Sequence, residues 1–100
     1  MIRQLIFRPE AVEDVAQAAG WYEERSGGLG EDLIDEILVA TNRAARNPDL
    51  FRIVRARGEV RRVLTERFPY RIFFSVIGGT LYVHAVLHGA QHDRRWRDRV

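Results

Sequence analysis

Arginines gather on two neighbouring segments whose sequence alternates as strands do. Arg61 and Arg62 begin one of these segments, Arg67 follows it, and Arg71 begins the next. A guanidinium is always charged and carries a planar fork of donors, so it pairs well with phosphates and carboxylates. Clustered charge of one sign is unfavourable unless an anion answers it. We therefore interpret the cluster as a positive platform for phosphates or an acidic protein, and prefer this to a solvated surface with scattered ion pairs.

The three histidines offer weaker chemistry. His84 and His88 share a face of one predicted strand, but four strand residues separate them by ~13 Å, too far for one metal ion. We therefore expect neither a metal site nor a cofactor. A general-acid role for His88 or His92 beside arginines is conceivable because imidazole titrates near neutrality. For His88 we prefer a strand-end residue that is hydrogen-bonded to the backbone.

Two further stretches combine aromatic and charged residues. Trp21 and Tyr22 end the first predicted helix, where core anchoring is the usual role and an anchor for a partner helix is the alternative. Residues 92–100 hold four arginines and one tryptophan. The tail could be a finger that binds nucleic acid, or Trp96 could simply fasten it to the sheet. We expect Trp96 to dock the tail on the open face of the sheet, with three arginines facing outward. These three are Arg94, Arg95 and Arg97.

Composition limits the class of protein. One hundred residues with 46% apolar side chains make a single domain, residues 1–100, with one small core. Absence of cysteine removes thiol chemistry and fits a reducing cytoplasm. No run of residues is long and apolar enough for a membrane span, and the N-terminus does not resemble a signal peptide, so we expect a cytoplasmic protein.

Charge divides the chain in two. All sixteen basic residues are arginine, and the net charge is +2. Residues 10–36 hold nine acids and one arginine, whereas residues 43–71 hold nine arginines and three acids. The second half should therefore attract an anionic partner.

The predicted elements place these residues on a two-layer fold. Residues 2–7 suggest a strand and residues 9–25 an amphipathic helix, in which Gly20 suggests a close helix–helix approach. A glycine-rich turn and a second helix, ending at Asn47–Pro48, complete an antiparallel helix hairpin. Strands are predicted at 51–55, 60–66, 70–77 and 81–88.

The alternation of the last two strands predicts which residues face the helices. We expect this face to carry Tyr70, Ile72, Phe74 and Val76 together with Leu81, Val83, Ala85 and Leu87. The order β-α-α-β-β-β, with a short helical or irregular tail, predicts an α+β two-layer sandwich: an antiparallel sheet packed on a helix hairpin.

In order and spacing, these residues resemble the ParE/RelE (plasmid-stabilisation) toxins of type II toxin–antitoxin systems along nearly the whole chain. The resemblance is carried by Ala11, Asp14, Trp21–Tyr22–Glu23–Glu24, Gly30, Pro48, Arg61–Arg62, Phe68–Pro69–Tyr70, Ala85–Val86–Leu87–His88, Trp96 and Arg99. It implies the same fold, a cognate antitoxin and a hetero-oligomer with it. It also implies that the target is either mRNA on the ribosome or DNA gyrase.

RelE-like members cleave mRNA on the ribosome, and this alternative would use Arg62, Arg71 and His88. ParE-like members bind and poison DNA gyrase. Here Gly89–Ala90–Gln91–His92 stands where the nucleases would place another arginine, and no tyrosine follows Tyr82. The resemblance therefore favours a ParE-like gyrase inhibitor that binds without catalysis; an inactive basic binding module is a third class.

Partner contacts follow from this interpretation. The expected target-binding residues are Arg61, Arg62, Arg71, Arg94, Arg95 and Arg97. The expected antitoxin-binding residues are Trp21, Tyr22, Leu33 and Ile37. We expect an acidic antitoxin segment, partly as a helix over the hairpin, with an added edge strand as a further possibility.

Overall fold

The computed structural model describes all residues, 1–100. Its elements are β1 (Gln4–Phe7), α1 (Pro9–Arg25), α2 (Leu29–Arg46), β2 (Ile53–Arg55), β3 (Val60–Leu64), β4 (Tyr70–Ile77), β5 (Thr80–His88) and α3 (Arg94–Arg97), with 3-10 turns at Pro48–Leu50 and Arg57–Glu59. The predicted α+β class is confirmed. Four strands follow the helix hairpin and not the three of the predicted order β-α-α-β-β-β, because β2, within the strand predicted at 51–55, is a short strand of its own.

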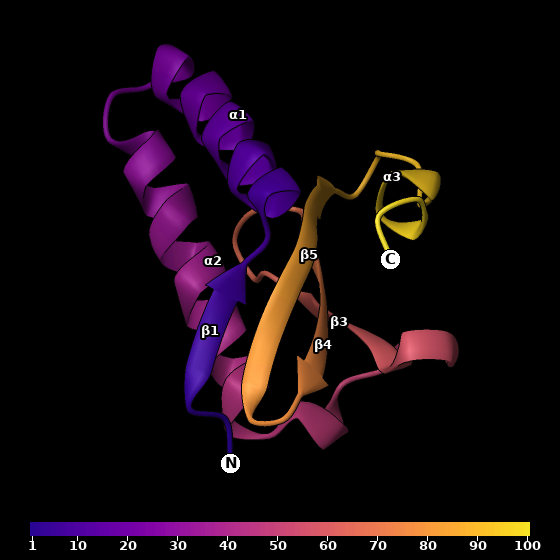
Figure 1. The fold of residues 1–100 in the computed structure, drawn as a ribbon. Coiled ribbons are helices and arrows are strands. Elements are labelled where there is room, and N and C mark those ends of the chain that lie inside the picture. Colours follow the sequence, from indigo (N-terminus) through magenta and orange to yellow (C-terminus); the bar gives the residue numbers. More distant parts are fainter.

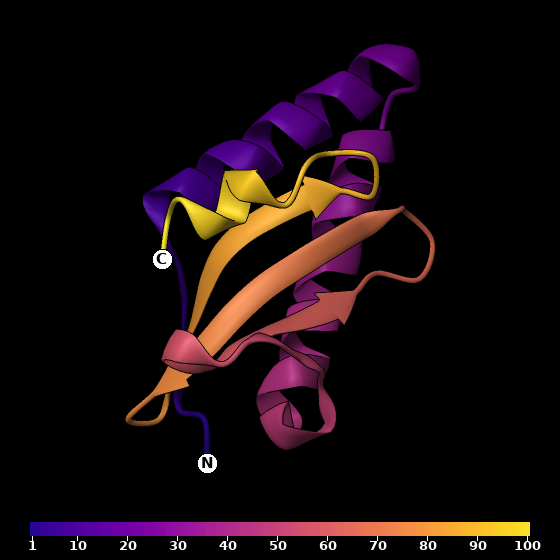
Figure 2. The ribbon, with the colours of Figure 1, turned by 90° about the vertical axis from the view of Figure 1, so that its right-hand side faces the viewer.

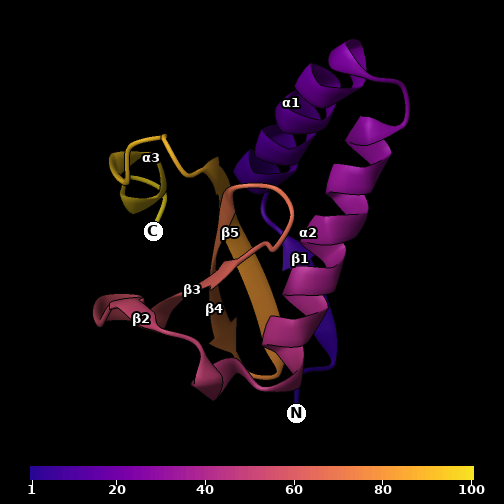
Figure 3. The same cartoon turned by 180° about the vertical axis from the view of Figure 1, so that it is seen from behind.

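One five-stranded sheet forms the second layer, in the order β1-β5-β4-β3-β2. The sheet is antiparallel as predicted, except that the edge strand β1 runs parallel to β5. The helix hairpin covers one face, and the C-terminal segment with α3 lies on the other side (Figure 1). From behind, α2 crosses the length of the sheet while α3 stands apart from both helices (Figure 3).

A short turn joins α1 to α2, and the side chain of Glu23 stabilises it. Gly28 adopts a left-handed conformation with φ of 91°. The carboxylate of Glu23 accepts hydrogen bonds from the amides of Gly28 (2.9 Å) and Gly30 (3.0 Å). A carboxylate at this place satisfies helix-end donors and opposes the positive end of the α2 dipole.

The close approach between the helices occurs at Gly30 and not at Gly20, contrary to the prediction from sequence. A Cβ added at Gly30 would lie 2.5 Å from the carbonyl oxygen of Ala19, whereas one added at Gly20 would meet nothing within 4 Å. Gly20 faces solvent near the end of α1, which the helical pattern alone does not reveal.

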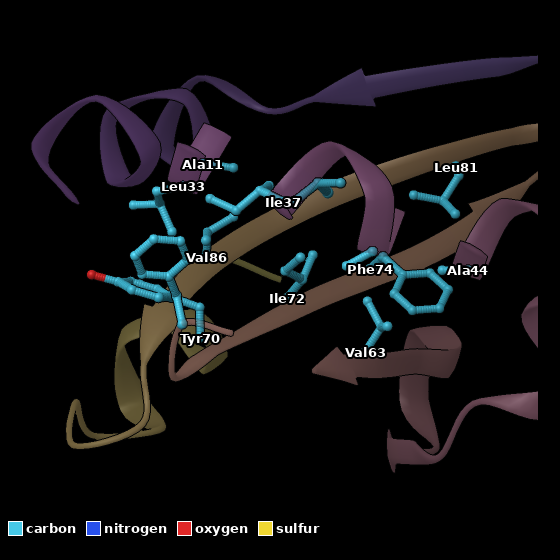
Figure 4. Close-up of a cluster of buried hydrophobic side chains, with 13 residues drawn as sticks. Ala11, Leu33, Ile37, Ala44, Val63, Tyr70, Ile72, Phe74, Leu81 and Val86 are labelled. Atoms are coloured by element: carbon cyan, nitrogen blue, oxygen red, sulfur yellow. The ribbon is translucent and has the colours of Figure 1, made fainter. Parts of the chain in front are cut away.

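The main core lies between the hairpin and the sheet (Figure 4). Leu33 and Ile37 from α2 meet Ile72 and Phe74 from β4, and each of the four is at most 1% exposed. Apolar residues at helical spacing therefore face apolar residues at strand spacing, which is what holds the two layers together.

A β-bulge in β5 changes which residues face the helices. Phe74 pairs with Val83 but Phe73 pairs with Ala85, so His84 is an extra residue in β5. The prediction that Ala85 faces the hairpin is therefore wrong, and so is the same prediction for Leu87. An inserted residue shifts the alternation by one, which sends every later side chain to the opposite face.

The reversed residues build a second, smaller core on the other face. It consists of Val60, Phe73, Ala85, Leu87 and Trp96. Figure 2 looks onto this side and shows the C-terminal segment lying over the strands. The tail therefore completes the fold. Neither long helix is apolar enough to cross a membrane.

Candidate functional site

The C-terminal tail is fastened to the sheet by Trp96, as predicted. Its ring stacks on Phe73 with centroids 4.8 Å apart and planes 17° apart, and it is fully buried. Stacking over so short a distance excludes water from the middle of this face. The surface that a partner meets is therefore formed by the tail as well as by the strands.

Arg71 holds the beginning of the tail and is not free for a target. Its guanidinium donates to the carboxylate of Asp93 and to the carbonyl of Gln91. The side chain is only 15% exposed, and the ion pair lowers the pKa of Asp93. The structure therefore counts against the predicted target contact at Arg71, whose charge is already paired with Asp93, a side chain that is 48% exposed.

A second buried ion pair, which we did not predict, holds the end of the tail. Arg99 donates to both carboxylate oxygens of Asp14, at 2.6 and 3.1 Å, and Asp14 also accepts from the amide of Val86 at 2.9 Å. The hydrogen bonds to Asp14 raise the pKa of Arg99. The sequence does signal this site, because Asp14 lies between the apolar residues Ala11 and Val15 of α1. It does not reveal the partner of Asp14, because Arg99 lies 85 positions away.

Arg61 is also engaged within the protein. It is 15% exposed, donates to the carbonyl of Phe51 at 2.8 Å and lies 3.6 Å from the carboxylate of Asp49. Its low exposure and its bond to the carbonyl of Phe51 count against the predicted target contact at Arg61. Like Arg71, Arg61 joins the sheet to a neighbouring segment.

Other arginines remain without an ion pair and surround the tail. Arg62 pairs across the strands with Phe73 and therefore lies on the tail's face, and its amide donates to the carbonyl of Arg52. Arg55 reaches the carbonyls of Arg97 and Val100, which brings the 3-10 turn at residues 57–59 to the end of the tail. We call the following set the basic face: Arg52, Arg57, Arg62, Arg94, Arg95 and Arg97.

The residues of a nuclease site are not brought together. Arg62 and Arg71 lie on the tail's face, and Arg71 is bound to Asp93. The bulge places His88 on the helix face, where its ring meets the edge of Tyr70 at 5.5 Å. His88 Nδ1 accepts from the amide of Ala90, which fits the strand-end role preferred from sequence.

His84, the bulged residue, hydrogen-bonds to the hydroxyl of Ser75. Burial lowers the pKa of His84, and the positive charges of Arg8 and Arg55 act in the same direction. Ser75 is 5% exposed, so this pair has no open access to a substrate. Its effect is to hold the bulge in one register.

Of the expected antitoxin contacts, only the aromatic pair is accessible. Trp21 is 51% exposed, with the guanidinium of Arg25 3.4 Å from its ring centre, and Tyr22 is half-buried. Both line a cavity of about 280 Å³ beside Tyr70, and burial raises the pKa of Tyr70 to about 12. Leu33 is 0% exposed and belongs to the core, so it does not meet a partner, whereas Ile37, 1% exposed, belongs to the core and also lines the apolar groove described next.

An apolar groove lies next to these core residues, between the two helices and β1. Its lining is entirely hydrophobic: Phe7, Val12, Val15, Ala16, Ile34, Ile37 and Leu38. Val12 is 54% exposed and Leu38 is 43% exposed. Glu13, Glu31, Asp35 and Arg8 are exposed one helical turn from groove residues, so acids outnumber bases among the charged neighbours of the groove.

Comparison with known proteins agrees with this geometry. Residues 5–93 match the profile of a family described as the ParE toxin of the type II toxin-antitoxin system parDE. A solved structure titled "Chromosomal ParDE TA system from P. aeruginosa" superposes with a TM-score of 0.75 and 18% sequence identity, covering 87% of this chain and 96% of that chain. No curated protein matches the chain by sequence.

Proposed function

The chain belongs to the ParE toxin family of type II toxin–antitoxin systems, and from this premise we propose that it inhibits DNA gyrase by binding, in the cytoplasm, and is neutralised by a cognate antitoxin. The observation that carries the proposal is the filled sheet face. Trp96 and Phe73 are 0% and 1% exposed where a nuclease would need an open cleft, while exposed arginines surround them. Such a surface is built to hold a macromolecule and offers no assembled acid–base set.

The experiment compares the two targets directly. Purified toxin is added to a plasmid-supercoiling reaction with gyrase, and separately to a translating ribosome extract in which mRNA cleavage is mapped. The proposal expects loss of supercoiling and an intact message. Codon-specific cuts by the wild-type protein would contradict it and favour the ribonuclease.

The antitoxin is the second part of the proposal. The apolar groove supports a helix that lays apolar residues, spaced three and four apart, against Val12, Ile34 and Leu38. Because acids outnumber bases around the groove, the flanks of that helix should be neutral or basic. An acidic antitoxin segment fits the basic face instead, so we revise the expectation that the acidic segment lies over the hairpin.

A charge introduced into the groove tests this placement. Leu38→Glu should weaken binding of the neighbouring gene's product by at least tenfold, because a carboxylate would be buried against an apolar helix. Leu50→Glu is the matched control, since Leu50 is 77% exposed and lies outside the groove. Titration calorimetry measures both. Equal affinity of the two variants would place the antitoxin elsewhere.

A further inference from the structure

The six arginines of the basic face have almost no internal counter-charge; Arg3, Arg8, Arg25, Arg46 and Arg55 also lack an ion pair. Arg43, Arg61, Arg67, Arg71 and Arg99 each lie within ion-pair distance of an acid. None of the six arginines of the basic face does so, and five of them are exposed, with Arg62 half-buried. The acids of the same segments are Glu59 and Asp98, which are exposed, and Asp93, which is half-exposed and paired with Arg71. The face therefore carries an excess of positive charge that the protein itself does not neutralise.

The tail holds these charges in fixed positions. Trp96 is stacked on Phe73, and the ion pairs of Arg71 and Arg99 secure its two ends. Arg55 adds a hydrogen bond of 2.8 Å to the carbonyl of Val100. Arg94, Arg95 and Arg97 are therefore presented from an ordered backbone, which lowers the entropy that binding must overcome.

The face lacks the exposed aromatic rings that single-stranded nucleic acids use, and its apolar centre is covered by the tail. Its two large aromatic rings, Phe73 and Trp96, are stacked on one another and buried, so no exposed ring of this pair is free for an unpaired base. Protein interfaces carry an apolar centre inside a polar rim, whereas the tail already covers the centre of this face, so an acidic protein segment would bind it through charge alone and would compete with a phosphate backbone. What remains exposed is a set of guanidiniums, and duplex backbones are recognised by such sets.

We propose that the basic face binds the phosphate backbone of duplex DNA without reading its sequence. This inference rests on the proposed function, because gyrase acts on duplex DNA. It adds that the toxin touches the DNA as well as the enzyme. Arg94, Arg95 and Arg97 supply phosphate contacts from the tail, and Arg52, Arg57 and Arg62 supply them from the strands and the neighbouring turn.

The test uses the full-length toxin and two triple variants of equal net charge. Arg94→Gln/Arg95→Gln/Arg97→Gln removes three charges from the basic face. Arg3→Gln/Arg25→Gln/Arg46→Gln removes three exposed arginines from the start of the chain and from the ends of α1 and α2, outside that face. Circular dichroism first checks that both variants fold. Fluorescence anisotropy then measures binding to a labelled random-sequence duplex and to a single-stranded RNA over a range of salt concentrations.

We expect the wild type to prefer the duplex, with an affinity that falls steeply as salt rises. Loss of three phosphate contacts should flatten the slope of log affinity against log salt by about 2.7 and weaken binding at least about tenfold at moderate salt. The control triple should keep the wild-type slope. No salt-dependent duplex binding, equal losses in both triples, or a preference for single-stranded RNA would each overturn the inference.

A supercoiling assay on the same proteins separates this inference from the proposed function. Inhibition of gyrase by a wild-type toxin that does not bind duplex DNA overturns the inference and leaves the function standing. Duplex binding without inhibition of gyrase supports the inference and overturns the proposed function. Inhibition that is weakened in the basic-face triple but kept in the control triple supports both.

Discussion

At the scale of single residues, the two glycines of the helix hairpin have opposite roles although both sit in helices. Gly20 has free space around a prospective Cβ, while Gly30 is pressed against the carbonyl of Ala19. Gly20→Ala should raise the free energy of unfolding by about 0.5–1 kcal/mol, because alanine costs less conformational entropy in a helix. Gly30→Ala should lower it. Urea unfolding of both variants measures the difference, and a destabilised Gly20→Ala would contradict the open environment.

Glu23 links the end of α1 to the start of α2. Glu23→Gln keeps one acceptor but loses the charge and one of the two amide hydrogen bonds, so we expect about 1 kcal/mol lower stability. The neighbouring Glu24 is exposed and makes no side-chain hydrogen bond, so Glu24→Gln is the matched control and should be neutral. Thermal melting compares the two. Equal melting temperatures would mean that the hairpin turn does not depend on this cap.

His84 makes the fold sensitive to moderate acid. Its folded pKa lies below the ordinary value of 6.5, so the unfolded chain takes up a proton first as the pH falls. Stability contributed by neutral His84 is therefore complete above 6.5 and is lost as the pH falls toward the lower folded pKa. Urea unfolding at about pH 8 and about pH 5 should show a smaller difference for His84→Gln than for wild type.

The exposed His92 provides the control for this pH dependence. His92→Gln should keep the wild-type difference between the two conditions. If both variants flatten the dependence equally, or neither does, the bulge histidine is not its source.

At the scale of elements, the tail is part of the core. Trp96→Ala removes a fully buried ring from the second cluster and should cost about 3–5 kcal/mol, a large share of the stability of a domain this size. Trp21→Ala, at a site 51% exposed, should cost much less. Denaturant unfolding measures both, and a mild effect of Trp96→Ala would show that the tail is dispensable for folding.

Because Trp96 is buried in the core, the tail's role in toxicity cannot be tested by deleting the tail. Deleting residues 93–100 would leave Asp14 without Arg99 and Arg71 without Asp93, so loss of growth arrest by a truncated protein would report unfolding. The charge variants at Arg94, Arg95 and Arg97 avoid this difficulty, because these side chains are exposed and make no ion pair.

At the scale of the whole molecule, the charge of the protein is divided between its two layers. The helix hairpin is acidic with an apolar groove, and the sheet side with the tail is basic. A partner that covers the groove binds only the folded state, so a hundredfold excess over the dissociation constant should add about 2.7 kcal/mol of stability. For a domain of this size the melting temperature should rise by more than about 10 °C when the neighbouring gene's product is added. Scanning calorimetry measures the shift, and an unchanged melting temperature would exclude that product as the antitoxin.

The sequence by itself determined the elements, the layers and the division of charge. Helical spacing in 9–25, strand alternation in 70–77 and the arginine-rich tail are local patterns, and local patterns act through propensity and periodicity. Trp96 could be assigned to the sheet from sequence because a lone tryptophan among arginines has few other places to bury its ring.

The tertiary structure decided which arginines form an ion pair within the protein and which do not. The bulge at His84 turned Ala85 and Leu87 to the other face of the sheet. Apolar residues occupy every second position of β5 from Leu81 to Leu87, so the sequence does not reveal that one residue is inserted. Arg71 and Arg99 carry the same side chain as Arg94, yet they are neutralised by Asp93 and Asp14. An ion pair between residues 85 positions apart depends on how the layers stack, so only the folded chain separates the arginines that hold the tail from those that face a partner.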